Sequence, residues 1–432
     1  MDALTAITVG LIAWAFAVHL PLVYTVLGLT WLLPTLELIG LRRNDDRYFE
    51  IARSLSRYLI FIYAIGGVFG TIITVFLAGL MPVFTNAAGI LLWPVWGVAI
   101  VFGVAIALPM IGYYYRSFGK MDERSHIAVG YGLAVVTSVI PAMFRLVFAF
   151  INYPLGVIAK PDPNSIVGFD LGVDMMQALG NPTYPPLLIA TLAGAIAFTA
   201  TLISAVYTWR YAKTKDEHYK IGKEFGAKVG LIFGVIYVLA SVWYLYEVYL
   251  YSPTVAWSIF GSPPSYLPAQ LQPVYQPTLD LSWLFYLNIV LGVIVLAFLA
   301  TALRSANAGL AMVAFVAVIA LMDGAEVLNG LAHLPYAIVP SPPVATALIQ
   351  AYGVDFALKV ADTLKVSALI TPSINSLVQL IAAQPWLLDF SLVMFIAFNL
   401  ILLGGIYLVF SWRGAQPQAG QPPSSGSQAE SS

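Results

Sequence analysis

The sequence contains no cysteine among its 432 residues, and this absence excludes several classes of site. Without thiolates the chain has no disulfide bonds, iron–sulfur clusters, classical zinc sites or thiolate-ligated haem. Any redox cofactor must therefore be held by histidine, methionine or carboxylate side chains, and the sequence offers only 4 histidines.

Charged residues are also scarce. They make up 9% of the chain, whereas apolar residues make up 60%, and the mean hydropathy is +0.86. This balance excludes an ordinary soluble domain, because a water-facing surface needs more charge. The net charge of −1 gives no electrostatic attraction for nucleic acid, so we expect the lipid bilayer and no nucleic acid as surroundings.

Long apolar runs are abundant instead. A bilayer core of about 30 Å needs about 20 mainly apolar residues per helix, and about nine segments are long enough. The runs are continuous rather than alternating, which predicts helices and not a barrel. We therefore predict an all-α polytopic membrane protein. The predicted helices are 7–31, 53–80, 88–115, 126–152, 185–211, 225–251, 281–303, 306–331 and 389–412.

Basic residues fall on alternate loops of this arrangement. On one side the basic residues are Arg42, Arg43, Arg47, Arg53, Arg57, Arg116, Lys120, Arg124, Arg210, Lys213, Lys215, Lys220, Lys223, Lys228, Arg304 and Arg413. The other side carries only Lys160, Lys359 and Lys365. By the positive-inside rule the N-terminus is outside, the C-terminus is cytoplasmic, and the chain is a multi-pass protein of the cell membrane.

The chain is organised as one membrane domain. Residues 1–415 form this helical domain, and an amphipathic segment, 340–388, is expected on its outer surface. Residues 416–432 are rich in Gln, Ser, Pro and Gly and are expected to be a disordered cytoplasmic tail. The proline-rich outer loops 153–184 and 252–280 are expected to be irregular, ordered caps. The first segment lacks a basic region and a cleavage site, which favours a retained helix.

A second amphipathic stretch, 42–57, is expected to connect the first two helices on the cytoplasmic side. No internal repeat is visible, so the sequence does not favour an inverted-repeat transporter.

Ionisable residues inside the membrane are costly and are candidates for function. Asp323 and Glu326 are three positions apart and share a helix face. Most of the candidates fall in the outer half of the predicted bundle, where they can converge on one site. The candidates are His19, Arg145, Glu247, Asp323, Glu326 and His333.

Each candidate also has a purely structural interpretation. His19 can donate a hydrogen bond to a backbone carbonyl, and His333 can be a loop residue. Arg145 can pair with Glu247, Asp323 or Glu326, because a buried charge needs a partner. His126 and His218, at cytoplasmic helix ends, are expected to be solvated or to cap those helices.

Several motifs occur in an order that resembles a known family. They are 17–37, which contains His19 and ends at Glu37; the glycine-punctuated 66–79; 116–120 with 124–126; 150–156; and 204–210. Together they resemble subunit I of the cytochrome bd quinol oxidases, which has nine helices and an external N-terminus. The resemblance implies oxidation of quinol at the outer side and reduction of oxygen through haem, beside a homologous subunit II.

The resemblance also implies roles for particular residues. His19 falls at the axial ligand of a high-spin haem, of which one or two are expected, and Arg145 would hold a haem propionate. Glu326 or His333 would supply a second ligand or carry protons. Glu326 and Asp323 are the candidate catalytic carboxylates.

Three departures from the family affect its other cofactor positions. Trp96 and Val104 stand where the family has two glutamates in its third helix. In the family a histidine and a methionine ligate the low-spin haem. Here Leu187, or a neighbour, replaces the histidine, and Asn288 replaces the methionine, so we do not expect that haem. The family's Gly-Arg-Gln-Pro-Trp motif is matched in part by two segments, 332–336 and 383–386. The outer loop 252–280 has only one ionisable residue, Asp280.

Two alternatives stay open at this point. One is a cofactor-poor paralogue that acts as a structural or quinone-binding subunit of a respiratory complex. The other is an ion channel or transporter in which Arg145 and the carboxylates line an ion path.

Overall fold

The computed structural model of the chain describes residues 3–80, 93–165, 168–336 and 342–364, with isolated residues between 379 and 400. The chain divides into two units, Met1–Ala382 and Ala383–Ser432, and the account below concerns the first unit. The predicted tail lies outside the described residues, and the predicted ninth helix lies almost wholly outside them.

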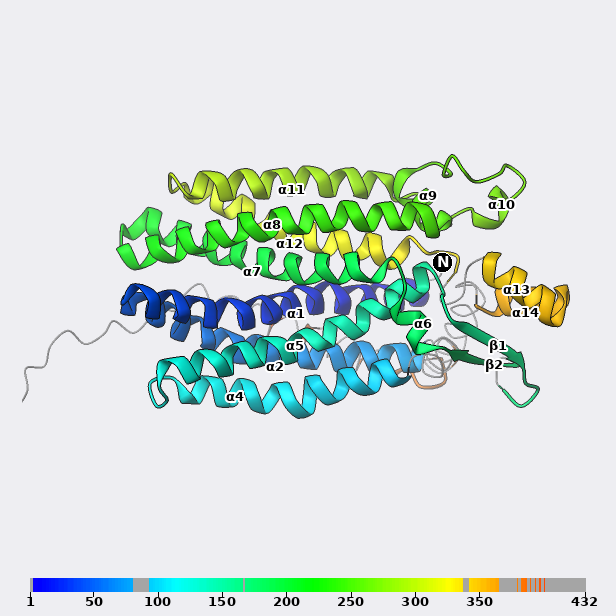
Figure 1. Ribbon diagram of the computed structural model, residues 1–432, viewed down its shortest axis with the longest axis horizontal. Helices are drawn as coiled ribbons and strands as arrows, with labels where there is room; N and C mark the ends of the chain where they lie inside the picture. Colours follow the sequence, from blue (N-terminus) through cyan, green and yellow to red (C-terminus); the bar gives the residue numbers. More distant parts are fainter. Residues whose placement is uncertain are drawn as a thin grey trace, which may run out of the picture. The chain divides into compact units, whose positions relative to one another are not determined.

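Eight helices in the described residues are long and apolar enough to cross a membrane. They run side by side along the bundle (Figure 1). The prediction of an all-α polytopic membrane protein is confirmed, whereas the sidedness of the termini stays a prediction. The helices are α1 (Ala3–Arg43), α2 (Asp46–Leu80), the span Trp93–Ser117, α5 (Glu123–Asn152), α7 (Tyr184–Thr214), α8 (Glu217–Tyr251), α11 (Ser282–Ala302) and α12 (Ala308–Leu331).

The third of these spans contains a change of helix type. It includes a π-helical stretch, η1 (Val101–Ala107), which continues directly into α4 (Leu108–Ser117). Such stretches widen a helix locally and often lie at functional positions. This change could not be predicted, because the apolar residues continue through the stretch without a break.

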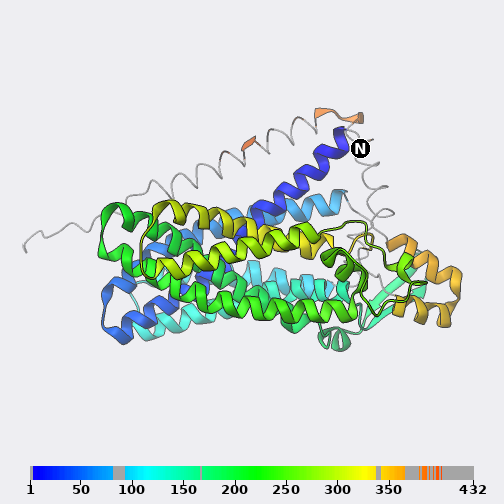
Figure 2. The ribbon, with the colours of Figure 1, turned by 90° about the horizontal axis from the view of Figure 1, so that it is seen from above.

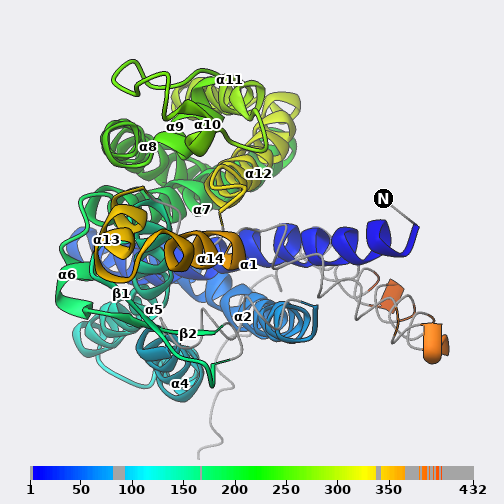
Figure 3. The same ribbon diagram turned by 90° about the vertical axis from the view of Figure 1, so that its right-hand side faces the viewer.

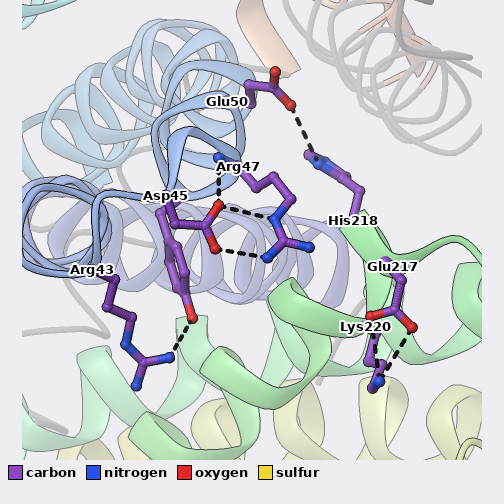
Figure 4. Close-up of polar contacts among 8 residues, drawn as sticks. Arg43, Asp45, Arg47, Glu50, Glu217, His218 and Lys220 are labelled. Atoms are coloured by element: carbon purple, nitrogen blue, oxygen red, sulfur yellow. Dashed lines mark hydrogen bonds and ion pairs between the residues drawn. The ribbon is translucent and has the colours of Figure 1, made fainter.

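The connection between α1 and α2 is shorter than expected. The predicted amphipathic connector 42–57 is mostly the first turns of α2, so that prediction was wrong; only Asn44 and Asp45 separate the helices. Asn44 has a φ of 52°, which turns the chain. Asp45 accepts hydrogen bonds from the backbone and the guanidinium of Arg47 (Figure 4), and these bonds lower the pKa of the Asp45 carboxyl.

Short elements gather at the opposite end of the bundle (Figure 3). Two strands, β1 (Val157–Pro161) and β2 (Phe169–Val173), form an antiparallel hairpin in the loop that was expected to be irregular. Each strand has only 5 residues, so alternation was too short to stand out. The other elements there are α6 (Met175–Leu179), α9 (Pro253–Phe260), α10 (Gln272–Tyr275), α13 (Pro342–Tyr352) and α14 (Val354–Leu364).

The amphipathic helices α13 and α14 pack on this end. Leu348 and Val360 are buried in one cluster with Phe150 of α5 and Phe169 of β2. The described part of segment 340–388 therefore covers the end of the bundle with its apolar face.

Helices α7 and α8 pack closely against each other. Four glycines of α8, spaced by four residues, lie on the side facing α7 and α11. A Cβ at Gly226 would lie 2.6 Å from the Ala200 carbonyl oxygen and 2.7 Å from the Ser204 nitrogen. Small residues at this spacing let helix backbones approach closely in a membrane. The four are Gly222, Gly226, Gly230 and Gly234.

Helix α1 connects the two halves of the bundle because it packs against α2, α5, α7 and α12. Its N-terminal part leans away from the other helices (Figure 2), and Pro21 and Pro34 lie inside it. Proline removes a backbone hydrogen bond and is a common cause of helix bending.

Candidate functional site

His19 lies on the side of α1 that faces α2. Its Nδ1 atom is 2.9 Å from the carbonyl oxygen of Gly66, to which it must donate. In the neutral ring the Nε2 atom therefore carries no hydrogen. A metal-binding histidine commonly donates its other ring N–H to a backbone carbonyl in this way, which fixes the tautomer. It is also the structural hydrogen bond that the sequence allowed, so the contact fits both interpretations.

The surface of α2 beside His19 is made of glycines. A Cβ at Gly70 would lie 3.0 Å from the Cε1 atom of His19, whereas a Cβ at Gly67 would meet nothing within 4 Å. Gly70 therefore lets the imidazole ring lie close to the backbone of α2. A neutral imidazole nitrogen that carries no hydrogen can ligate iron, as in haem.

Arg145 of α5 and Glu326 of α12 form a buried ion pair. The Arg145 Nη1 atom donates to Glu326 Oε2 at 3.0 Å, and Nη2 donates to Glu326 Oε1. The Tyr24 hydroxyl of α1 donates to the same carboxylate and accepts from Arg145 Nη2 at 2.9 Å. The Arg145 side chain is 7% exposed and that of Glu326 is 10% exposed, so three helices are joined by charge-assisted bonds in a dry environment.

The other predicted carboxylates do not join this cluster. Glu247 accepts a hydrogen bond from the indole of Trp243 at 2.9 Å, one turn away on α8. Asp323 lies one turn from Glu326 but has a buried oxygen, Oδ1, without a hydrogen-bond partner in the described structure. A buried carboxyl without a partner is a candidate for binding a proton.

His333 belongs to a separate network at the outer-loop end. Its Nε2 atom is 3.0 Å from Asn152 Oδ1, and Asn152 donates to the Tyr244 hydroxyl at 2.8 Å. Tyr244 donates in turn to Asn329 Oδ1 at 2.7 Å. A neutral His333 that donates from Nε2 gives this row of groups one consistent direction. Burial lowers the pKa of His333 to about 4, which keeps the ring neutral.

The predicted site residues are thus brought together only in part. Arg145 and Glu326 meet, as one structural interpretation required, while His19 and His333 lie in different surroundings. Five positions separate His19 from Tyr24 on α1, a rotation of roughly 140° about the helix axis, so His19 faces α2 while Tyr24 faces α5 and α12.

Leu187 and Asn288, which the resemblance places at the low-spin ligand positions, lie against other helices of the bundle. Leu187 is buried in a cluster with Tyr244, Val248 and Leu284, which fills the space around it with apolar side chains. Asn288 has a buried oxygen without a partner and lies against Gly324 of α12, where a Cβ would be 2.3 Å from that oxygen.

One buried cluster was missed from the sequence. His126, expected to be solvated or capping, is instead 4% exposed, and its Nδ1 atom lies 2.5 Å from Oε2 of Glu37. The Tyr114 hydroxyl donates to the other oxygen of Glu37, and His126 Nε2 is 3.0 Å from the Tyr114 carbonyl oxygen. The error arose because His126 lies only three residues inside α5, where exposure is usual; the helices α1 and α4 cover it.

Comparisons with known proteins agree with this fold. A search of curated proteins found no match. Among solved structures, the chain is similar to the bd oxidase from Geobacillus thermodenitrificans, with a TM-score of 0.68 and 18% identity. That match covers 88% of this chain and 99% of the other. The family model of cytochrome bd terminal oxidase subunit I matches residues 10–257, more than half of the sequence. The chain therefore belongs to the cytochrome bd terminal oxidase subunit I family.

Proposed function

We propose that this chain is a haem-binding subunit of a bd-type quinol oxidase, with His19 as the axial ligand of a high-spin haem. Held by His19, such a haem would supply electron transfer from quinol to oxygen. The observation that carries the proposal is the His19–Gly66 hydrogen bond, because it fixes the tautomer in which the Nε2 atom carries no hydrogen.

The role proposed for Arg145 differs from the one that the resemblance implied. Its guanidinium already contacts the Glu326 carboxylate and the Tyr24 hydroxyl, so a protein carboxylate takes the place of a haem propionate. We assign Arg145 and Glu326 to holding α1, α5 and α12 in register. Asp323, which has an unpartnered oxygen, is the better candidate for binding a proton.

A six-coordinate low-spin haem is not part of the proposal, since neither Leu187 nor Asn288 is a ligand that such a haem uses. Electrons would then reach the His19 haem from a partner subunit rather than through a low-spin haem of this chain. A heteromeric complex with a homologous membrane subunit, and quinol as the donor, follows from this reasoning.

The test is a haem measurement on the complex purified through a tag on this chain. We expect a high-spin haem in a reduced-minus-oxidised spectrum, and we expect extracted haem to be lost in His19→Ala. Gly67→Leu is a second variant, because it adds a side chain next to Gly66, whose carbonyl orients His19, at a position where the fold has room for it.

Gly292→Leu is the matched control, since a Cβ at Gly292 also meets nothing within 4 Å and it lies on α11. Equal haem content in Gly67→Leu, His19→Ala and the parent would refute the assignment of His19. A folded, colourless parent protein would instead support the cofactor-poor paralogue.

A further inference from the structure

Three basic side chains lie at the end of the bundle where the α7–α8 and α11–α12 turns are found (Figure 1). Lys213 is in the last turn of α7, Lys215 directly follows that helix, and Arg304 is in the α11–α12 turn. All three residues are exposed. We call these three residues the basic platform.

The carboxylates that are nearest to the basic platform in the sequence are already engaged. Glu217 accepts a hydrogen bond from Lys220 Nζ at 3.2 Å, and Glu224 forms an ion pair with Lys228 at 3.8 Å. Asp216 accepts from a backbone amide of the first turn of α8. Among the described residues, no carboxylate therefore neutralises the basic platform.

Aromatic rings hold two of the three cations in place. The Lys213 Nζ atom lies 3.7 Å from the centroid of the Trp209 ring, and the Lys215 Nζ atom lies 5.5 Å from that of Tyr211. The face of an aromatic ring attracts a cation without neutralising its charge. An ammonium group has three donors, so a lysine held over a ring can still donate to an anion.

Lys223 joins the α11–α12 turn to the same region. Its side chain is buried, and its Nζ atom donates to the carbonyls of Ala302 at 2.6 Å and Ser305 at 3.3 Å. The same Nζ atom lies 5.6 Å from the centroid of the Tyr211 ring. These two carbonyls flank Arg304 in the chain, so Lys223 fixes the turn that carries Arg304 beside α7 and α8.

The basic platform lies where membrane-spanning helices end. Trp209 packs against the apolar cluster that α11 and α12 share, and tryptophan at such a helix end is typical of the headgroup level of a bilayer. The first turns of α12 expose Met312, Val313 and Val316. This end of the bundle therefore offers positive charge at headgroup level and apolar surface in the adjoining part of the membrane span.

We propose that the basic platform binds the headgroup of an anionic phospholipid. Lys213, Lys215 and Arg304 donate charge-assisted hydrogen bonds to its phosphate oxygens, while an acyl chain lies on the exposed apolar residues of α12. Basic sites between membrane helices hold anionic lipids in this way. The bound lipid joins the α7–α8 hairpin to the α11–α12 turn, and its binding is independent of haem.

The test measures lipid binding to the complex purified through a tag on this chain and stripped of lipid with detergent. Phosphatidylglycerol is added, and bound lipid is counted by native mass spectrometry. We expect Lys213→Gln/Arg304→Gln to weaken binding by about tenfold or more. The matched control is Lys120→Gln/Arg124→Gln, which removes the same charge from exposed positions of the α4–α5 turn and should bind like the parent.

Further arms separate charge from shape and lipid from free anion. Lys213→Arg/Arg304→Lys keeps both charges and should retain the lipid. The lipid should also raise the unfolding temperature of the parent more than that of the glutamine variant. Should the glutamine variant unfold at a lower temperature than the parent without lipid, Lys215→Gln with Lys120→Gln as its control gives the same comparison.

Three outcomes would overturn the proposal. One is equal binding of phosphatidylglycerol in the parent, the platform variant and the control. Another is equal binding of phosphatidylcholine and phosphatidylglycerol by the parent, because the platform would then not select a net negative headgroup. The third is displacement of the lipid by inorganic phosphate, which would show a site for a free anion rather than for a lipid.

Discussion

Arg145 and Glu326 lie 181 positions apart in the sequence and form a two-pronged ion pair between α5 and α12. Both charges are almost completely buried, and Tyr24 bonds to both. The pair therefore ties the first, fourth and eighth membrane spans together at one point.

Removing one member of this pair should destabilise the fold strongly. Arg145→Met leaves the Glu326 carboxylate buried without its cation, at a cost of about 3–5 kcal/mol. Thermal unfolding in detergent measures the loss. Arg145→Met/Glu326→Leu should recover much of it, because no lone charge remains, and a double variant as unstable as the sum of the single ones would contradict the coupling.

The glycine row of α8 should tolerate no added side chain where it meets α7. Gly226→Leu places carbon atoms against the Ala200 carbonyl, and overpacking of this kind costs about 1–3 kcal/mol or more. We expect a lower unfolding temperature or no folded protein. Gly292→Leu, in open space on α11, serves as the control and should unfold like the parent.

Lys223 should stabilise the C-terminal end of α11. Its Nζ atom donates to the Ala302 carbonyl at 2.6 Å, where a helix end presents unpaired carbonyls and negative potential. Lys223→Met keeps the aliphatic stem and should cost about 1–3 kcal/mol in thermal unfolding, as for a lost bond to a charged group. Lys228→Met, on the same helix, should change the unfolding temperature little. Lys228 is exposed, and its ion pair with Glu224 is long, at 3.8 Å.

His333 should make the protein sensitive to acid. Its pKa is lowered from 6.5 to about 4 by burial, so the unfolded chain binds the proton more readily than the folded one. The free energy of unfolding is therefore unaffected by His333 above pH 6.5. As the pH decreases from 6.5 toward 4, it falls by about 1.4 kcal/mol per pH unit.

Unfolding temperatures measured between these pH values should follow this slope in the parent. His333→Gln should flatten it, because glutamine does not titrate. An identical pH dependence in both proteins would show that another group is responsible.

The membrane helices could be predicted from apolar runs, because length and hydropathy are local properties of the sequence. Their ends were less predictable. The start of α2 at Asp46 follows from the turn at Asn44 and Asp45, whose conformation depends on side-chain hydrogen bonds to Arg47. The hairpin of β1 and β2 was missed because strands of this length carry too few residues for alternation to show.

The candidate site was predictable only as a set of residue types. The cost of burying charge identified Arg145, Asp323 and Glu326, but which carboxylate would pair with Arg145 depends on how α5 and α12 pack. Glu37 and His126 lie near helix ends in the sequence, and their burial results from the covering helices α1 and α4. That long-range effect has no local signal.

The close approach of α7 and α8 has a consequence for how the protein enters the membrane. Only Lys215 and Asp216 separate the two helices, so they leave the ribosome nearly together. Gly222 and Gly226 let the two helices pair closely at once, before α11 and α12 have been made. The hairpin is therefore expected to insert as one preassembled unit, onto which the later helices are added.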